Sequence, residues 1–273
     1  YAVAHSLLTE SLAINRELGD RTEAANVLAE LGPVGWLQGD YVVARASYEE
    51  ALAIKRELGE TETMPAVLNN LAVLVMDQGD YPAALSLHQE SLEIEQAMGD
   101  DYGVATSSVN LGVIYWYLGD NEQALARHAE SLAVFRKLGH KPGIALALNS
   151  SGFAACDKGD FALAHSSHTE SLRLRRELGD QAGIVECLEG LARVLSQAPP
   201  PLGNPGRAAH LWGASEALRE ALGAHLTPAD RARLDPSIAA AQSQLTEQAY
   251  RLANDEGRAM TPEQAVAYAL NDA

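Results

Sequence analysis

The sequence has few cysteines, and this limits its chemistry. Cys156 and Cys187 are the only two among 273 residues. A disulfide framework uses more cysteines than this, and neither residue belongs to a CxxC pair of the kind used in redox or zinc sites. We therefore expect two reduced, ordinary thiols.

Basic residues and long apolar runs are also scarce. The chain has 20 Lys and Arg against 37 Asp and Glu, a formal net charge of −17. Nucleic-acid phosphates need clustered cations, so we expect no direct nucleic-acid partner. No apolar run approaches the roughly 20 residues that span a bilayer. The start YAVAHSLLTESL has no basic start and no apolar signal core. These observations predict a soluble, cytoplasmic chain without a membrane partner.

Patterns of common catalytic and metal sites are missing as well. The sequence contains no HExxH, no GxSxG and no phosphate loop GxxxxGK[ST]. His88, His128 and His168 recur 40 residues apart. One imidazole per stacked helix pair separates them by about 10 Å, too far to share a metal ion. We expect packing histidines, no cofactor, no metal and no enzyme, since an enzyme would need a polar constellation that is not found.

What the sequence does have is one segment that occurs five times. ESLAINRELGD at 10–20 recurs with small changes at 50–60, 90–100, 130–140 and 170–180. A Gly-Asp pair lies midway, first at Gly39-Asp40 and then every 40 residues to Gly159-Asp160. A fixed period of this kind indicates stacked repeats that bury their apolar faces against their neighbours. Each repeat therefore consists of two segments.

Both segments of a repeat show helical periodicity. Between Tyr41 and Leu58, Ala44, Tyr48 and Ala51 fall on one helical stripe. The glycine after each segment suits the left-handed residue just past a helix end. Small residues let neighbouring helices approach closely. Within each 40-residue repeat we call the helix that comes first in the sequence the first helix and the other the second helix. Small residues recur at one site of the first helices, at Gly32, Ala72, Gly112, Gly152 and Ala192. They also recur at one site of the second helices, at Ala4, Ala44, Ala84, Ala124 and Ala164.

These positions resemble a known repeat. Leu71-Ala72 to Val75, followed by Gly79-Asp80-Tyr81, Ala84, His88 and Ser91, is similar to the tetratricopeptide repeat. Runs such as Leu68-Asn-Asn-Leu-Ala72 resemble its longer variety, found in kinesin light chains and many bacterial signalling proteins. The resemblance covers about residues 1–224. It implies an all-α, right-handed α-solenoid, a superhelix of stacked antiparallel helix pairs.

The repeats also predict where the array begins and ends. We expect a half repeat at 1–20, full repeats at 21–60, 61–100, 101–140 and 141–180, and an irregular repeat at 181–224. The proline-rich stretch 198–206 should not be crossed by a helix. Thr227-Pro228 and Thr261-Pro262 each predict a helix start within a C-terminal helical cap at 225–273. Because the chain begins without Met inside an expected helix, we also expect it to be part of a longer protein.

The C-terminal tail carries a second resemblance. From LWGASEALREALGAHLTPADRARL to EGRAMTPEQAVAYAL, it resembles the end of a bacterial family of large signalling proteins. These have a STAND-type nucleotide-hydrolysing switch, C-terminal tetratricopeptide repeats and often an N-terminal DNA-binding or kinase domain. The resemblance implies that the chain is the sensor arm, covalently linked to the switch domain in its parent protein. A constitutive interaction scaffold or cargo adaptor is the alternative.

In tetratricopeptide repeats the first helices line a concave groove, where a peptide or protein partner usually lies. By register, we predict that apolar residues, asparagines and rim residues of these helices bind it. They are Trp36, Asn69, Val73, Met76, Asn110, Val113, Trp116, Tyr117, Asn149, Phe153, Cys156 and Arg193. The two tryptophans fit packing equally well, and for the asparagines we favour structural hydrogen bonds.

One stretch departs from the repeat pattern. Gly32-Pro33-Val34-Gly35 stands where the other first helices continue. We expect a kink or a break there. A kink or break would indicate either a widened groove or hinge, or relaxed selection for local stability. We favour relaxed selection.

Overall fold

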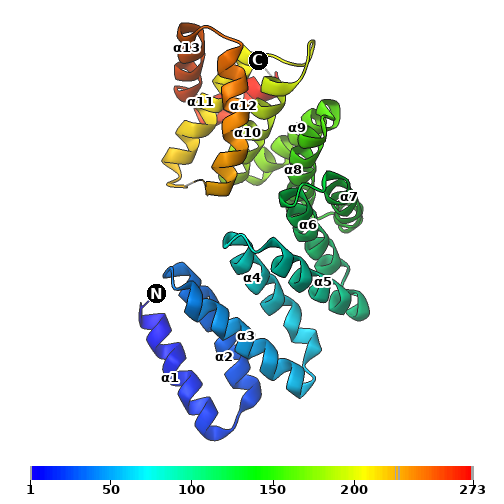
Figure 1. Cartoon of the computed structure of the whole chain (residues 1–273), viewed down its shortest axis with the longest axis vertical. Helices are drawn as coiled ribbons and strands as arrows, with labels where there is room; N and C mark the ends of the chain where they lie inside the picture. Colours follow the sequence, from blue (N-terminus) through cyan, green and yellow to red (C-terminus); the bar gives the residue numbers. More distant parts are fainter. Residues whose placement is uncertain (1, 225, 227, 272–273) are drawn as a thin grey trace. The chain divides into compact units, whose positions relative to one another are not determined.

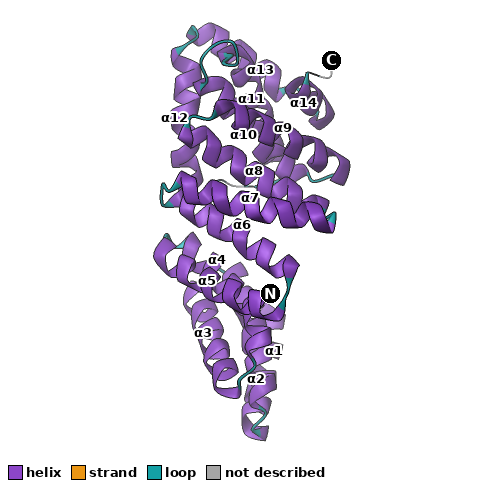
Figure 2. Cartoon of the chain, turned by 90° about the vertical axis from the view of Figure 1, so that its right-hand side faces the viewer, coloured by secondary structure: helices purple, strands orange, loops and turns teal. Residues whose placement is uncertain are grey.

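The computed structural model describes residues 2–224, 226 and 228–271. This part of the chain contains fourteen α-helices, one short 3₁₀ helix and no strand (Figure 2). The all-α repeat solenoid predicted from the sequence is confirmed. The chain divides into two compact units, residues 1–120 and 121–273, and each is described by itself (Figure 1).

Unit 1 consists of three first helices and three second helices. In order along the chain these are α1 (Ala2–Leu18), α2 (Arg21–Leu37), α3 (Tyr41–Leu58), η1 (Thr61–Thr63), α4 (Met64–Asp77), α5 (Tyr81–Met98) and α6 (Asp101–Tyr117). The second helices are α1, α3 and α5, and α2 and α4 each pack against the second helix that follows. The core consists mainly of Leu, Val and Ala side chains together with Tyr48 and Met64.

Unit 2 continues with the same alternation and then adds helices at its C-terminal end. Its elements are α7 (Asn121–Leu138), α8 (Lys141–Lys158), α9 (Phe161–Leu178), α10 (Gln181–Gln197), α11 (Pro205–Ala221), α12 (Pro228–Ser243), α13 (Glu247–Arg258) and α14 (Pro262–Leu270). The proline-rich stretch after Gln197 is not helical, as predicted.

The recurring Gly-Asp pair ends one helix and begins the next. At the end of α2, Gly39 has a φ of 75° and the Asp40 amide donates to the Gly35 carbonyl at 2.9 Å. The Asp40 carboxylate then accepts from the Val43 amide at 3.0 Å and caps α3. A residue with positive φ favours glycine, and a short acceptor favours the N-cap. The helix stops predicted from the repeat are confirmed.

The repeated motif also supplies ion pairs between successive second helices. Arg56 of α3 pairs with Glu90 of α5 at 2.8 Å, and Arg136 of α7 pairs with Glu170 of α9 at 2.9 Å. Arg16 and Glu50 pair at the same sequence spacing. Exposed pairs of this kind contribute little to stability, so the stacking depends mainly on the buried apolar side chains.

The small residues of the repeat lie where helices approach closely. Those on the first helices are buried, as are those on the second helices from Ala44 onward, whereas Ala4 on the first helix of the chain is exposed. At Gly152, an added Cβ would lie 2.6 Å from the His168 ring. The absence of a side chain is therefore required for the packing of α8 on α9.

The expected break at Gly32-Pro33-Val34-Gly35 is wrong. Helix α2 continues from Arg21 to Leu37 with Pro33 inside it. The glycines have a packing role instead, because an added Cβ at Gly32 would lie 2.3 Å from the Tyr48 ring. At Gly35 it would lie 3.0 Å from the Ala44 backbone nitrogen. The packing of α3 on α2 therefore explains both glycines.

Beyond the proline-rich stretch, α13 packs directly on α11. A Cβ added at Gly213 of α11 would lie 2.1 Å from the Asn254 carbonyl oxygen, and one added at Gly257 of α13 would lie 2.0 Å from the His210 carbonyl oxygen. Helix α12 comes between these two in sequence but packs on α10 and α11 (Figure 1). Helix α12 therefore does not lie between α11 and α13, which pack directly on each other.

The predicted start of the last helix is confirmed. Thr261 accepts from the Gln264 amide at 3.2 Å, and the Gln264 side chain accepts from the Thr261 amide at 2.9 Å. Thr227, the other predicted cap, lies outside the described residues. The boundary between repeat array and cap at 224/225 stays a prediction, and it differs from the division into compact units.

Candidate binding surface

The predicted groove residues of unit 1 lie on the first helices α2, α4 and α6. We call this set the first-helix face of unit 1. Trp36 is 40% exposed, and the other members are half-buried. The set comprises Trp36, Asn69, Val73, Met76, Asn110, Val113, Trp116 and Tyr117. The apolar members of this set are thus partly accessible to solvent. The other apolar residues of the same helices form the core.

Aromatic rings gather at the end of α6. Tyr117 stacks on Tyr81 of α5 with centroids 5.1 Å apart and an interplanar angle of 12°. Trp116 lies tilted against Tyr117 at 5.0 Å. All three aromatic side chains are half-buried, so this aromatic cluster is partly accessible. Sequence reasoning selected Trp116 and Tyr117 but missed Tyr81, which begins the neighbouring second helix.

Asn69 and Asn149 both have structural partners. The Asn69 side-chain oxygen lies 2.8 Å from Nδ1 of His88, and the Asn149 oxygen lies 2.9 Å from Nδ1 of His168. Asn149 is also buried, at 3% exposure, and its amide nitrogen donates to Glu186 at 3.1 Å. This is the structural alternative that we favoured for the asparagines. It leaves Asn110 as the asparagine of the set without such a histidine bond.

In unit 2 two further predicted positions are buried, whereas Phe153 is half-buried. Cys156 is 2% exposed and Arg193 is 6% exposed. Arg193 forms an ion pair with Asp157, and Arg233 of α12 reaches the same carboxylate at 3.5 Å. These groove residues are therefore already engaged within the protein.

Helix α12 contacts α10 next to these residues. Gln197 donates to Ser237 of α12 at 2.6 Å, and Gln244 donates to the Ser196 carbonyl at 2.9 Å. The Cys156 sulfur lies 3.8 Å from the Gln197 side-chain oxygen. In unit 2 the chain's own helix α12 thus contacts the end of α10, and Cys156 is packed by α9, α10 and the stretch after Gln197.

Phe153 is half-buried and packs against His168. Its ring meets His168 edge-on, with centroids 4.8 Å apart and an interplanar angle of 71°. His168 is itself fully buried. The aromatic side chain of this repeat therefore contributes to the packing of α8 on α9.

The recurring histidines are neutral packing residues. Burial lowers the pKa of His88 and of His128 to about 4, and that of His168 to about 3. No group of residues in the described part of the chain could hold a metal ion. A ring that is neutral at neutral pH adds no charge to the core.

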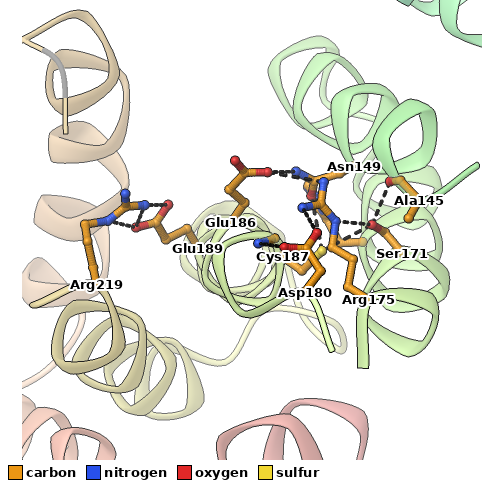
Figure 3. A network of polar contacts seen from close by, with 11 residues as sticks. Ala145, Asn149, Ser171, Arg175, Asp180, Glu186, Cys187, Glu189 and Arg219 are labelled. Carbon is orange, nitrogen blue, oxygen red and sulfur yellow. Dashed lines mark hydrogen bonds and ion pairs between the residues drawn. The ribbon is translucent and has the colours of Figure 1, made fainter. Parts of the chain in front are cut away.

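A polar network links α8, α9 and α10 in unit 2 (Figure 3). Arg175 contacts Asp180 at 3.1 Å and Glu186 at 3.2 Å, and its Nε donates to Ser171. Burial raises the pKa of Glu186, while the nearby Arg175 opposes the rise. Arg175 lies between the two carboxylates, so removing it would leave their negative charge without this cation.

Glu189 holds the position that Asn69 and Asn149 occupy in earlier repeats. Its carboxylate accepts three hydrogen bonds from Arg219 of α11, at 2.6, 2.7 and 3.1 Å (Figure 3). Sequence reasoning missed this pair, because Arg219 lies 30 residues further along and outside the 40-residue period. The sequence did contain one signal, because Glu189 replaces the asparagine found at this position in two earlier repeats.

A cavity of about 560 Å³ lies among α10, α11, α12 and α13. Its carboxylates are paired, Glu189 with Arg219 and both Glu216 and Glu220 with Arg258. The lining residues include Trp212, Leu234, Ile238, Gln242, Tyr250 and Asn254. The cavity is assembled from four helices, which the repeat period does not relate to one another.

Comparisons with known proteins agree with this geometry. Residues 63–137 match the family model described as tetratricopeptide repeat. None of the curated proteins matches the chain. No helix among the described residues has the length and apolar character needed to cross a membrane.

Solved structures share the fold at low sequence identity. The apo form of RapI is 17% identical, with a TM-score of 0.67 over 93% of this chain and 90% of RapI. A Rap protein complexed with competence and sporulation factor is 17% identical, with a TM-score of 0.60 over 87% of this chain and 66% of that protein. A putative kinesin light chain from P. anserina is 16% identical, with a TM-score of 0.59 over 74% of this chain and 97% of its own.

The matched repeat model and the stacked helix pairs define the fold class. The described part of the chain is an all-α repeat solenoid, and residues 63–137 match the tetratricopeptide repeat.

Proposed function

We propose that the chain is a non-enzymatic module that binds a peptide or protein partner on the first-helix face of unit 1. The observation that carries this proposal is the contrast between the two units. Met76 and Trp116 are half-buried in unit 1, whereas Cys156, at the same register position, is buried in unit 2. Partly accessible apolar side chains on a rigid scaffold are typical of an interaction surface.

We further propose that the module is the cytoplasmic sensor arm of a bacterial STAND-type signal-transduction ATPase. The resemblance of the C-terminal tail to that family supports this role, which would link partner binding to a nucleotide-binding switch and to transcription regulation. The Rap protein complexed with competence and sporulation factor has a similar fold, which supports the capacity of such a fold to hold a partner. The repeat array at 1–224 would be the sensing part and residues 225–273 its cap.

A constitutive interaction scaffold or cargo adaptor is the alternative. In that case the partner would stay bound and no switch would be attached. Sequencing the native gene upstream of Tyr1 decides between the two. A phosphate loop in the same reading frame supports the sensor arm, and an open reading frame without one overturns it.

The binding proposal is tested by a pull-down from a bacterial lysate with the whole chain. The Trp36→Ala, Trp116→Ala double variant should lose the retained partner, since these side chains are the largest on the first-helix face. Met98→Ala is the matched control, because Met98 is 46% exposed at the end of α5 and outside that face. Circular dichroism should show all variants folded. Equal retention by the double variant and the control would contradict the proposal.

A further inference from the structure

The cavity among α10, α11, α12 and α13 has the size of a small-molecule site. Its volume of about 560 Å³ lies within the roughly 300–1,000 Å³ that such sites occupy. The residues that line it belong to unit 2, so it shares no residue with the first-helix face of unit 1. A ligand in this cavity would therefore be distinct from the proposed protein partner.

The described carboxylates that line the cavity are held by arginines of the protein itself. Glu189 is 6% exposed and accepts its three hydrogen bonds from Arg219 (Figure 3). Glu216 and Glu220 of α11 both pair with Arg258 of α13, each at 2.7 Å. A cationic ligand would have to displace one of these arginines, which would leave a guanidinium without its carboxylate.

The lining also includes a cation without an acidic partner. Arg231 lies in the first turn of α12 and is exposed. Within the described part of the chain its side chain forms no ion pair and no hydrogen bond. A guanidinium presents several donors to one carboxylate at once. The cavity therefore offers an anionic ligand a guanidinium that no carboxylate of the protein occupies.

Much of the remaining lining is apolar. Trp212 of α11 and Leu234 of α12 are 5% and 7% exposed, and Ile238 of α12 and Tyr250 of α13 are half-buried. These side chains come from three helices, so a ligand among them would be enclosed from several sides. An apolar ring in this position would leave water and meet two aromatic side chains.

We propose that this cavity binds a small organic acid with an apolar ring as its body. The acid group pairs with Arg231, and the ring lies among Trp212, Leu234, Ile238 and Tyr250. This inference goes beyond the proposed function and does not depend on it.

The charges decide between an acid, an amine and a neutral molecule of the same shape. An amine would find the carboxylates already paired and would meet Arg231 as a like charge. A neutral molecule would gain the apolar contacts and leave Arg231 to water. An acid gains both, and its charge-assisted hydrogen bond should favour it over the neutral analogue by about tenfold.

Three matched probes and the purified whole chain test the inference. They are 1-naphthaleneacetate, its amide and 1-naphthalenemethylamine, which carry the same ring with an anionic, a neutral or a cationic group. Isothermal titration calorimetry at neutral pH should give the acid a dissociation constant of about 1 mM or tighter. The amide should bind about tenfold more weakly and the amine should not bind. Added salt should weaken binding of the acid and not of the amide.

Variants of the exposed Arg231 test the charge without disturbing the core. Arg231→Gln should weaken the acid by about tenfold and leave the amide unchanged, and Arg231→Lys, which keeps the charge, should weaken the acid less. Arg251→Gln is the matched control. Arg251 of α13 pairs with Glu247, is 74% exposed and does not line the cavity. This variant makes the same change in net charge and should bind the acid as the native chain does.

A second pair of variants tests the cavity itself. Ile238→Trp places a large ring in the cavity and should abolish binding of both the acid and the amide. Ala239→Trp places the same ring on the exposed neighbouring position and should leave binding unchanged. Circular dichroism should show both variants folded. If Ile238→Trp does not fold, the Arg231 variants still decide, because that side chain is exposed.

Equal affinity of the chain for the acid and the amide would overturn the inference, as would preference for the amine or the absence of binding by the acid. Equal weakening of the acid by Arg231→Gln and Arg251→Gln would also overturn it, since the attraction would then be unspecific. None of these outcomes bears on the proposed function, because Trp36 and Trp116, which the lysate experiment changes, lie in unit 1.

Discussion

The three recurring histidines show how one repeat position acquires different surroundings. His88 bonds to Asn69 and His168 bonds to Asn149, in each case 19 residues earlier in the sequence. The residue 19 positions before His128 is Val109, which has no hydrogen-bonding side chain. Both ring nitrogens of His128 are buried without a hydrogen-bond partner. Burial alone therefore lowers the pKa of His128 to about 4.

This predicts a loss of stability in mild acid. The folded pKa of His128 lies below its unfolded value of 6.5, so its contribution is complete above pH 6.5 and is lost as the pH falls toward 4. At pH 5 the loss from His128 should be about 2 kcal/mol. We expect the His128→Leu variant to show a correspondingly smaller decrease in unfolding free energy between neutral pH and pH 5, measured with urea.

The imidazole proton signals in NMR spectra provide the control. The His128 ring should stay neutral down to about pH 5 in the native chain, as its lowered pKa requires. A ring that titrates near pH 6.5 would contradict the prediction. So would a variant whose acid sensitivity equals that of the native chain.

At the scale of elements, α12 contacts the first helix α10. It contacts α10 through polar groups and small residues, with Ser237 and Ala241 fully buried. The packing of α13 on α11 uses Gly213 and Gly257 and does not involve α12. Helix α12 is therefore an added cover on a stack that is complete without it.

We predict that a bulky residue at Ser237 displaces α12 from α10. The Ser237→Trp substitution leaves no room for α12 on α10, because Ser237 is 0% exposed. The backbone amides of α12 should then exchange their protons at least tenfold faster, which hydrogen-exchange mass spectrometry can measure.

Two controls make this test specific. Ala239→Trp places the same side chain on an exposed position of α12 and should leave exchange in α12 slow. The amides of α8 and α9 should stay protected in both variants. Faster exchange in α8 and α9 would indicate general unfolding, and unchanged exchange in α12 would contradict the prediction.

For the whole molecule, the uneven charge sets the response to salt. Residues 1–120 contain 19 acidic and 5 basic residues, whereas residues 121–273 contain 18 acidic and 15 basic residues. Like charges in unit 1 repel one another, and salt screens this repulsion. Raising NaCl from about 20 mM to about 300 mM should therefore slow amide hydrogen exchange in α4 to α6 more than in α8 to α10. Sucrose at equal osmolality is the control. Equal slowing in both units would contradict a charge effect.

The sequence predicted the candidate surface in unit 1 better than in unit 2. Register placed Met76 and Trp116 on one face, where the structure finds them half-buried. The same register selected Cys156 and Arg193, which the structure buries. Register depends only on the repeat period, whereas burial depends on whether another segment covers the face.

The sequence by itself determined the helices, their ends and their stacking into repeats. Glycine with positive φ and an aspartate that caps the next helix act within a few residues, so the Gly-Asp pairs are sufficient to locate the boundaries. Only the tertiary structure decided that α2 continues through Pro33 and that α12 covers α10. It also decided that Asn69 and Asn149 bond to histidines. These outcomes depend on contacts between residues distant in sequence, such as Gln197 with Ser237 and Gly32 with Tyr48, and no local pattern encodes them.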